Sequence, residues 1–259
     1  MSRIPFVLRR LAERVSRGVM FRRRLPKDLL GIRMWVTPSA SLRYWFPSLE
    51  RVDPRLLDTV RAVVTPGMCV WDVGANVGLF TFAAAAKAGR SGSVVAFEPT
   101  PSLAAMVRRT AATLPAGAAP VHVVEAAICG SSGVQELVQS SRSSSLNRLS
   151  GSRSGNEQSR GSVTVETRTL DSMMDEGPWP DVVKLDVEGL EAAVLEGAGR
   201  VLREARPIIL CETIPPQSIE VTSILTDNRY TILDGRKPFE PVEVPEASWA
   251  TLAIPIPTR

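Results

Sequence analysis

The sequence predicts an α/β fold built on an open, mostly parallel sheet with helices on both faces. From residue 70 onward, short apolar segments alternate with segments of helical periodicity. The apolar segments are nearly continuous runs, which is typical of parallel strands buried on both faces. Strand and helix in alternation indicate right-handed crossover units, and such sheets bind ligands at the carboxyl ends of their strands, near the point where strand order reverses.

The expected elements follow in order along the chain. Buried strands are expected at Val70–Val73, Val94–Phe97, Val121–Val124, Val182–Val187 and Ile208–Cys211. Helices are expected between them at Thr81–Ala88, Ser102–Leu114 and Leu190–Leu195. Because the chain has 259 residues, 44% of them apolar, it can bury a sizeable core. We therefore predict one main domain over residues 49–259.

The first 33 residues differ from the rest in charge. They carry ten Lys or Arg against two acidic residues, a local charge of +8, whereas the whole chain carries +4. Apolar residues recur there at helical spacing, at Ile4, Val7, Leu8, Leu11, Val15 and Val19. We predict a basic helical extension over residues 1–48, whose amphipathic helix either packs on the domain or contacts a membrane surface or an acidic partner.

The distribution of charge, apolar runs and cysteines along the chain indicates which partners and which cellular compartment to expect. The basic charge is concentrated in the extension over residues 1–48, which we call the head. The main domain therefore lacks the basic field that nucleic-acid binding needs. No apolar run approaches the roughly 20 residues of a membrane span. Three cysteines lie far apart in apolar runs, so neither a disulfide framework nor metal-ligand spacing is indicated. We expect a cytoplasmic protein that acts on a small molecule.

One segment interrupts the alternation of strands and helices. Residues 139–162 contain ten Ser, four Arg and three Gly among 24 residues, so they cannot bury enough surface to offset the entropy lost on ordering. The flanking segments Val134–Val138 and Val163–Thr167 can pair as an antiparallel ribbon. The insert is either a surface loop or a lid over the site.

The segment VWDVGANVG, residues 70–78, predicts a ligand-binding turn. A strand brings Asp72 to its carboxyl end, and Gly74, Asn76 and Gly78 shape the turn into the next helix, where glycine lets the backbone approach a ligand closely. The next strand ends at Glu98, 20 residues after Gly78, where a carboxylate can accept both hydroxyls of a ribose. Since an acid at the turn repels phosphate but attracts ammonium or sulfonium, we expect S-adenosylmethionine as the ligand.

A second charged segment lies in VVKLDVEGLE, residues 182–191. Lys184, Asp186 and Glu188 alternate along one strand, so their side chains lean to the same face near its carboxyl end. Buried charges are costly unless they are paired or solvated. The three residues form either an internal Lys184–Asp186 ion pair followed by a turn, or a reaction centre that faces the cofactor.

Together these motifs resemble the FkbM family of S-adenosylmethionine-dependent methyltransferases. The resemblance is carried by D-x-G-A-N-x-G at 72–78, F-E-P at 97–99, L-D at 170–171 and K-L-D-V-E-G-x-E at 184–191. It implies a Rossmann-like, doubly wound, seven-stranded sheet that is mostly parallel with an antiparallel last strand. The later strands would then be Tyr230–Leu233 and Trp249–Ala253. It also implies methylation of a hydroxyl on a sugar, polyketide or other specialised metabolite.

The resemblance assigns the cofactor to residues that follow the first three strands. Those at its methionine end would be Asp72, Gly74, Asn76 and Gly78. Glu98 would bind the ribose. Those that border the adenine would be Glu125, Ala126 and Ala127.

Methyl transfer to a hydroxyl is an in-line displacement, so the protein must align the acceptor and take up its proton. Asp186 is the expected base, with Glu188 or Glu212 as second choices and Lys184 beside them in the reaction centre. A magnesium-type ion held by these three carboxylates is an alternative, although the ligand set is incomplete and no metal ligand is assigned. The head, the stretch Trp35–Phe46 and the insert are expected to shape the acceptor pocket.

Two other functions remain open. A nicotinamide-dependent oxidoreductase would share the ribose carboxylate, but the glycine pattern differs from G-x-G-x-x-G and no Tyr-x-x-x-Lys follows. A non-catalytic adenosine-ligand-binding module, associated with a membrane through the basic head, would share the cofactor site without the chemistry.

Overall fold

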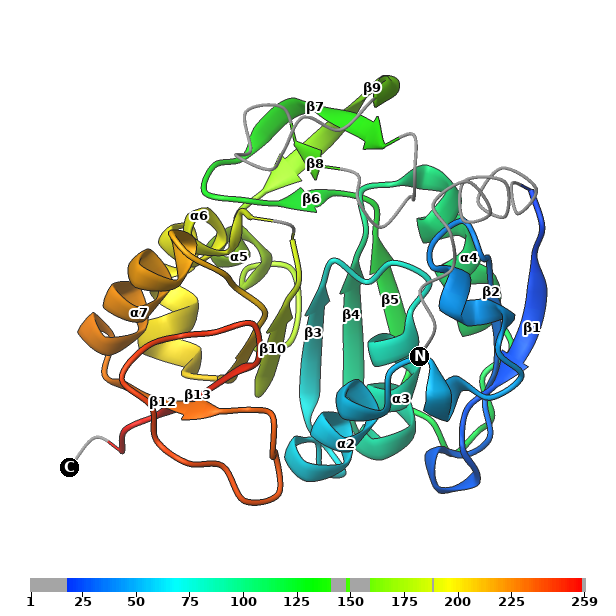
Figure 1. Cartoon of the computed structure of the whole chain (residues 1–259), viewed down its shortest axis with the longest axis horizontal. Coiled ribbons are helices and arrows are strands. Elements are labelled where there is room, and N and C mark those ends of the chain that lie inside the picture. Colours follow the sequence, from blue (N-terminus) through cyan, green and yellow to red (C-terminus); the bar gives the residue numbers. More distant parts are fainter. Residues whose placement is uncertain (1–17, 141–147, 150–158, 188, 258–259) are drawn as a thin grey trace, which may run out of the picture.

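The computed structural model describes residues 18–140, 148–149, 159–187 and 189–257. Its centre is a seven-stranded sheet in the order β12-β13-β11-β10-β3-β4-β5 (Figure 1). The strands are β3 (Cys69–Val73), β4 (Ser93–Phe97), β5 (Val121–Val124), β10 (Val182–Leu185), β11 (Ile208–Cys211), β12 (Tyr230–Asp234) and β13 (Thr251–Pro255). The predicted sheet is confirmed, with β10 two residues shorter than expected.

The strand directions are those of a doubly wound sheet. Strands β5, β4, β3, β10 and β11 pair in parallel, and β13 is antiparallel to both of its neighbours. The antiparallel last strand is thus confirmed. The chain builds outward from β3 to β4 and β5 on one side, and later adds β10 and β11 on the other. The switch point therefore lies between β3 and β10, where a ligand of such a sheet binds.

Helices cover both faces of the sheet. The helices are α2 (Pro54–Val63), α3 (Leu79–Ala88), α4 (Pro101–Ala111), α5 (Leu170–Met173), α6 (Glu191–Glu196) and α7 (Gln217–Asp227). Helices α2, α3 and α4 share one hydrophobic cluster with Val70 and Val182, whereas α5, α6 and α7 share another with Trp71 and Val183. Because side chains alternate along a strand, Asp72 and Lys184 lie on the same face as Val70 and Val182.

The described part of the head, residues 18–48, contains two short 3-10 helices, Lys27–Leu29 and Leu42–Trp45, but no α-helix. Strands β1 (Phe21–Arg24) and β2 (Arg33–Val36) form an antiparallel hairpin. Met34 and Val36 point inward and are fully buried in the cluster that contains α2 and α3. The helix predicted over Ile4–Val19 lies outside the described residues except for positions 18 and 19, which are not helical. Residues 18–48 therefore pack into the core of the main domain. The inward side chains alternate with outward ones along β2, and the net charge of the segment does not indicate this alternation.

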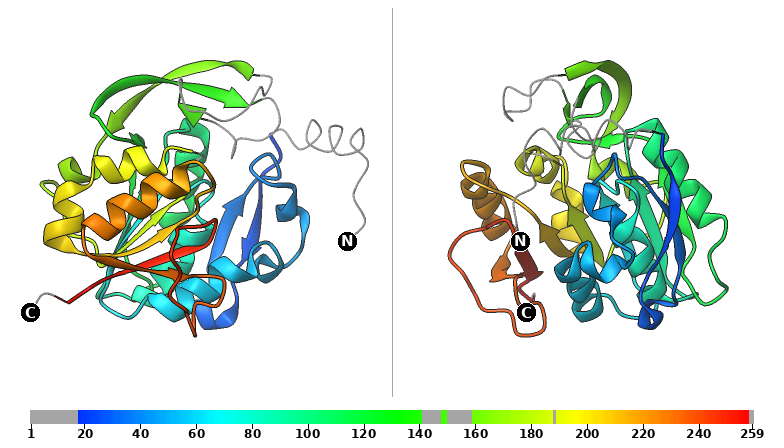
Figure 2. Two further views of the ribbon diagram at one scale, coloured as in Figure 1. Left: turned by 60° about the vertical axis from the view of Figure 1, so that its left-hand side comes forward. Right: turned by 45° about the vertical axis from the view of Figure 1, so that its right-hand side comes forward.

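A small second sheet follows β5. It consists of β6 (Ala127–Ile128), β7 (Gly133–Ser140), β8 (Arg148–Leu149) and β9 (Ser159–Arg168), in the order β6-β9-β7-β8. The predicted antiparallel ribbon is confirmed, since Val134 faces Glu166 and Val138 faces Ser162. The ribbon reaches into the polar insert because a strand ladder is held by backbone groups. It lies at the end of the molecule toward which β5 runs (Figures 1 and 2); residues 141–147 and 150–158 of the predicted loop or lid lie outside the described residues.

Candidate cofactor and acceptor site

The turn between β3 and α3 is held in place by its neighbours. Gly74, Asn76 and Gly78 all have positive φ, of 79°, 54° and 88°. A Cβ atom at Gly74 would lie 2.0 Å from the carbonyl oxygen of Asp186. The backbone N–H groups of Gly74 and Ala75 both donate to the carbonyl of Phe97 at 3.0 Å. The turn is thus fixed between the ends of β4 and β10. A glycine is required at position 74 because the Asp186 carbonyl leaves no space there for a Cβ atom.

Glu98 connects the turn to the end of β4. Its Oε2 accepts the backbone N–H of Asn76 at 2.8 Å, and its Oε1 accepts that of Thr100 at 2.9 Å. The side chain is buried, and this burial raises the pKa of Glu98 to about 7 against the opposing effect of the two N–H groups. The nearby Oδ1 of Asn76 is also buried and has no hydrogen-bond partner within the described ranges. Polar acceptors therefore gather at the switch point.

Asp72 and Lys184 form a buried ion pair across adjacent strands. They are register partners on β3 and β10, and Lys184 Nζ lies 3.2 Å from Asp72 Oδ1. The same Nζ donates to the carbonyl of Gly74 at 3.2 Å, while Thr81 Oγ1 donates to Asp72 Oδ2 at 2.5 Å. Burial opposes the charge on Lys184, but Asp72 and Asp186 raise its pKa above the ordinary value, so the amine stays protonated. Asp72, which is fully buried, can therefore act on a ligand only through Lys184 and the turn.

Asp186 lies directly after β10 and faces the turn. Its side chain is 43% exposed, and its Oδ2 lies 3.4 Å from Lys184 Nζ. Glu212 occupies the corresponding position after β11, where its side chain is exposed and its backbone N–H donates to Leu185 at 3.2 Å. Glu188, the other predicted carboxylate, lies outside the described residues. The structure thus brings Lys184 and Asp186 together at the turn and places Glu212 one strand away.

The predicted adenine border lies farther along the sheet edge. Glu125 follows β5 and pairs with Arg108, whose Nη1 lies 2.6 Å from Glu125 Oε2. Ala126 and Ala127 are buried, and Ala127 begins β6. None of the three lines the two cavities at the switch point.

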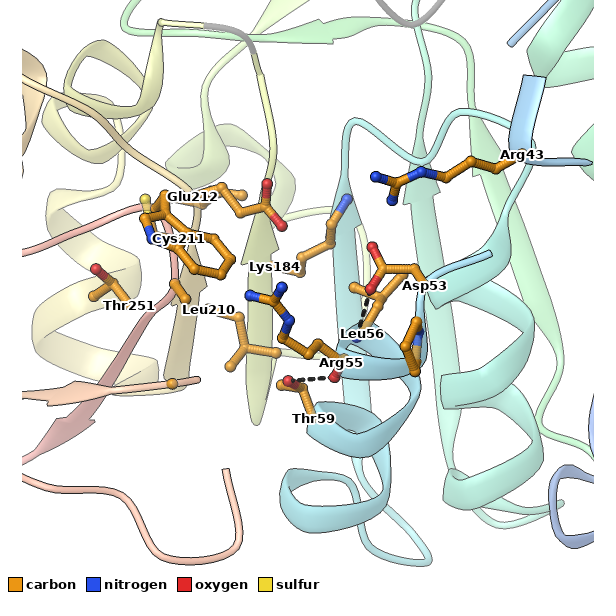
Figure 3. A pocket seen from close by; sticks show the side chains of 15 residues that line it. Arg43, Asp53, Arg55, Leu56, Thr59, Lys184, Leu210, Cys211, Glu212 and Thr251 are labelled. Carbon is orange, nitrogen blue, oxygen red and sulfur yellow. Dashed lines mark hydrogen bonds between the residues drawn. The ribbon is translucent and has the colours of Figure 1, made fainter. Parts of the chain in front are cut away.

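Two cavities meet beside Lys184. The smaller, of about 150 Å³, is lined by the turn residues 74–76, by Phe80 and by Asp186. The larger, of about 330 Å³, lies between α2 and the ends of β10 and β11 (Figure 3). Both are lined by Arg43, Asp53, Leu56 and Lys184. This arrangement provides one space at the glycine turn and a second, roomier space next to it.

Several lining residues were not predicted individually. Arg43 and Tyr44 come from the stretch Trp35–Phe46, which was expected only to shape the pocket. Burial, with the neighbouring Asp53, raises the pKa of Tyr44 above its ordinary value, so its phenol stays neutral in the wall of the smaller cavity. Asp53 and Pro54 carry an N-cap signature, since Asp53 Oδ1 accepts the backbone N–H of Leu56 at 3.0 Å. That signature predicts helix α2 but not that it borders the site.

The described part of the chain contains neither a grouped set of metal ligands nor a helix that could span a membrane. There, no three His, Cys, Asp or Glu side chains are grouped closely enough to hold a metal ion. The magnesium alternative, which depends on Glu188, stays a prediction. Over the same ranges no helix has the length and apolar character that a membrane crossing requires.

Comparison with known proteins identifies the family. The profile of the Methyltransferase FkbM domain matches residues 72–232. Hexuronic acid methyltransferase AglP of Haloferax volcanii is 28% identical over 164 residues, which are 62% of this chain and 63% of that protein. The matched part thus falls short of two thirds of that relative's length.

Solved structures with a similar arrangement are methyltransferases of low identity. Methyltransferase FkbM from Methylobacillus flagellatus is 16% identical with a TM-score of 0.43, covering 76% of this chain and 50% of that one. Precorrin-6y C5,15-methyltransferase from Geobacter metallireducens is 14% identical with a TM-score of 0.46, covering 78% and 88%. Because the profile match spans more than half of the chain and contains the glycine turn, Glu98 and the β10 charges, the chain belongs to the FkbM methyltransferase family.

Proposed function

We propose that this protein transfers a methyl group from S-adenosylmethionine to a hydroxyl oxygen of a small acceptor, a sugar or another specialised metabolite. The observation that carries the proposal is Glu98, whose buried carboxylate is tied to the glycine turn by the N–H of Asn76. Glu98 follows β4, which neighbours β3 on the side away from β10, and the turn that it contacts lies at the switch point of a sheet whose sequence belongs to a methyltransferase family.

The residues around the turn suit this cofactor. Thr100 interacts with the Glu98 carboxylate through its backbone N–H and its hydroxyl, whereas Oε2 accepts the N–H of Asn76 and retains a lone pair that can accept a ribose hydroxyl. The unpartnered Oδ1 of Asn76 can accept an N–H from the ammonium of the methionine end. The acids Asp53 and Asp186 line the smaller cavity and favour the positive charge of a sulfonium or ammonium group. The roles of Glu125, Ala126 and Ala127 at the adenine stay part of the proposal.

The cofactor, when bound, supplies an electrophilic methyl group on a sulfonium. The acceptor's hydroxyl oxygen forms the new C–O bond, the electron pair of the broken C–S bond stays on sulfur, and the hydroxyl proton needs a carboxylate. Asp186 is our candidate for this base, because it is partly exposed and lines the cofactor cavity. Lys184 orients it from 3.4 Å and stays protonated. Glu188 and Glu212 remain the second choices.

A sugar acceptor is supported by the relative. The name of AglP describes a methyltransferase of hexuronic acid, and the larger cavity, of about 330 Å³, is within the size range of small-molecule sites. Its lining contains the guanidinium groups of Arg43 and Arg55 and the indole of Trp249. Such side chains offer hydrogen-bond donors and an aromatic face.

The test is a transfer assay with methyl-labelled S-adenosylmethionine and a panel of hydroxylated sugars and polyketides. With a working acceptor, Asp186→Asn should lower turnover by roughly 10²- to 10⁴-fold, the usual contribution of a general base, while the dissociation constant for S-adenosylmethionine changes little. Asp227→Asn, an exposed acid at the end of α7, is the matched control and should retain full turnover. If Asp186→Asn turned over as fast as the wild-type protein, Asp186 would not be the base. If the wild-type protein methylated no acceptor of the panel, that result would count against the proposed activity.

A further inference from the structure

The lining of the larger cavity contains more cationic than anionic side chains. Its charged lining comprises Arg43, Arg55 and Lys184 against Asp53 and Glu212. Asp53 caps α2, and Lys184 pairs with Asp72 and Asp186. Glu212 lines the cavity from the end of β11. Arg43 and Arg55 are the remaining cations of this lining.

Neither arginine is engaged in an ion pair with any residue that the structure describes. The guanidinium of Arg43 donates one hydrogen bond within the described ranges, from Nη1 to the carbonyl of Val52 at 3.3 Å. The guanidinium carbon of Arg55 lies 4.6 Å from the ring centroid of Trp249. Stacking on an aromatic ring holds a guanidinium in one plane and leaves its N–H groups at the rim to bind a carboxylate.

The close-up view shows where these groups point. The guanidinium groups of Arg43 and Arg55 approach the space between α2 and the ends of β10 and β11 from two sides, with Lys184 between them (Figure 3). Arg43 also lines the smaller cavity, whereas Arg55 lines only the larger one. Arg55 is therefore placed to bind a part of the acceptor that lies away from the cofactor turn.

We propose that the larger cavity selects an acidic sugar, and that Arg55, stacked on Trp249 and assisted by Arg43, binds its carboxylate. This rests on the proposed function and names its substrate class. With the carboxylate at Arg55, a ring hydroxyl is left to face Asp186 and the turn. The product is then a methyl ether and not a methyl ester.

The first measurement is binding of p-nitrophenyl β-D-glucuronide and of the matched neutral β-D-glucoside, with and without S-adenosylhomocysteine. We expect the wild-type protein to bind the glucuronide about tenfold tighter or more, as a charge-assisted hydrogen bond provides. Arg55→Gln should abolish that preference and Arg55→Lys should restore part of it. The control is Arg51→Gln, an exposed arginine near the start of α2 that lines neither cavity, which should keep the preference.

The binding measurements distinguish a failure of the Arg55 assignment from a failure of the proposed cofactor. Equal binding of the two glycosides by the wild-type protein, or equal losses in Arg55→Gln and Arg51→Gln, would overturn the assignment of Arg55. An unchanged dissociation constant for S-adenosylhomocysteine in Arg55→Gln shows that the variant is folded. Failure of the wild-type protein to bind S-adenosylhomocysteine would instead contradict the proposal that S-adenosylmethionine is the cofactor. Where a glucuronide is methylated, a product stable to mild alkali supports the proposal, and an alkali-labile methyl ester contradicts it.

Discussion

Glu98 combines deep burial with two backbone N–H contacts, and its raised pKa gives stability a defined pH dependence. The folded state holds its pKa at about 7, against an ordinary value of 4.5. The folded protein therefore binds an extra proton between these values, so the stability from the protonated form is fully present below the ordinary pKa and is lost as pH rises toward about 7. Glu98→Gln keeps the shape of the side chain without this titration.

We expect the free energy of unfolding of the wild-type protein, relative to Glu98→Gln, to fall by roughly 1–3 kcal/mol over this pH range. Chemical denaturation of both proteins without cofactor, at several pH values, measures the difference. Parallel pH profiles for the two proteins would show that Glu98 titrates near its ordinary value.

Gly74 shows why the sequence located the turn correctly but gave only part of the reason for its glycine. A close approach at Gly74 was predicted, but the space beside its Cα is taken by the Asp186 carbonyl and not by a ligand, and its φ is positive. Gly74→Ala should destabilise the protein by about 2–4 kcal/mol, because it adds a left-handed backbone penalty to a clash with backbone. Thermal melting tests this, with Gly177→Ala as the control, since a Cβ there meets nothing within 4 Å. Equal melting temperatures for the two variants would contradict the close approach.

At the scale of elements, β10 is a buried strand whose charged face has a partner on β3. Alternation along the sequence correctly placed Lys184 and Asp186 on one face. An ion pair between those two was one of the two alternatives that it left open, and the structure adds a closer partner of Lys184, Asp72, at 3.2 Å against 3.4 Å for Asp186. Strand order was needed to see this, because pairing between β3 and β10 joins residues more than 100 positions apart.

The β1–β2 hairpin belongs to the core rather than to a separate extension. The local charge and the helical spacing of residues 4–19 predicted a basic helical extension over residues 1–48, whereas Met34 and Val36 of the hairpin are buried in the core. Met34 is fully buried, so Met34→Ala should lower the free energy of unfolding by about 2–5 kcal/mol. Arg33→Ala, on the exposed side of the same strand, should change it by no more than about 0.5 kcal/mol. Similar small effects in both, measured by urea denaturation, would show that the hairpin is not part of the cooperative unit.

At the scale of the whole molecule, the sequence predicted the sheet and the cofactor turn better than it predicted the acceptor pocket. The strands and the turn are local patterns, and Glu98 follows the turn at a fixed spacing. The larger cavity combines Arg43, Arg55 and Trp249 from separate segments that meet only after the sheet has formed. Their side chains form no recognisable motif, so only the fold brings their chemistry together.

The central claim is that the glycine turn at the switch point between β3 and β10, together with Glu98 after β4, binds S-adenosylmethionine. Titration calorimetry at pH 8, with NAD in parallel, tests it most directly. We predict one S-adenosylmethionine bound per chain, little or no binding of NAD, and a loss of about 1–3 kcal/mol of binding free energy in Glu98→Ala, as expected when charge-assisted hydrogen bonds are removed. Absence of S-adenosylmethionine binding to the wild-type protein, tighter binding of NAD, or an undiminished affinity in Glu98→Ala would contradict it.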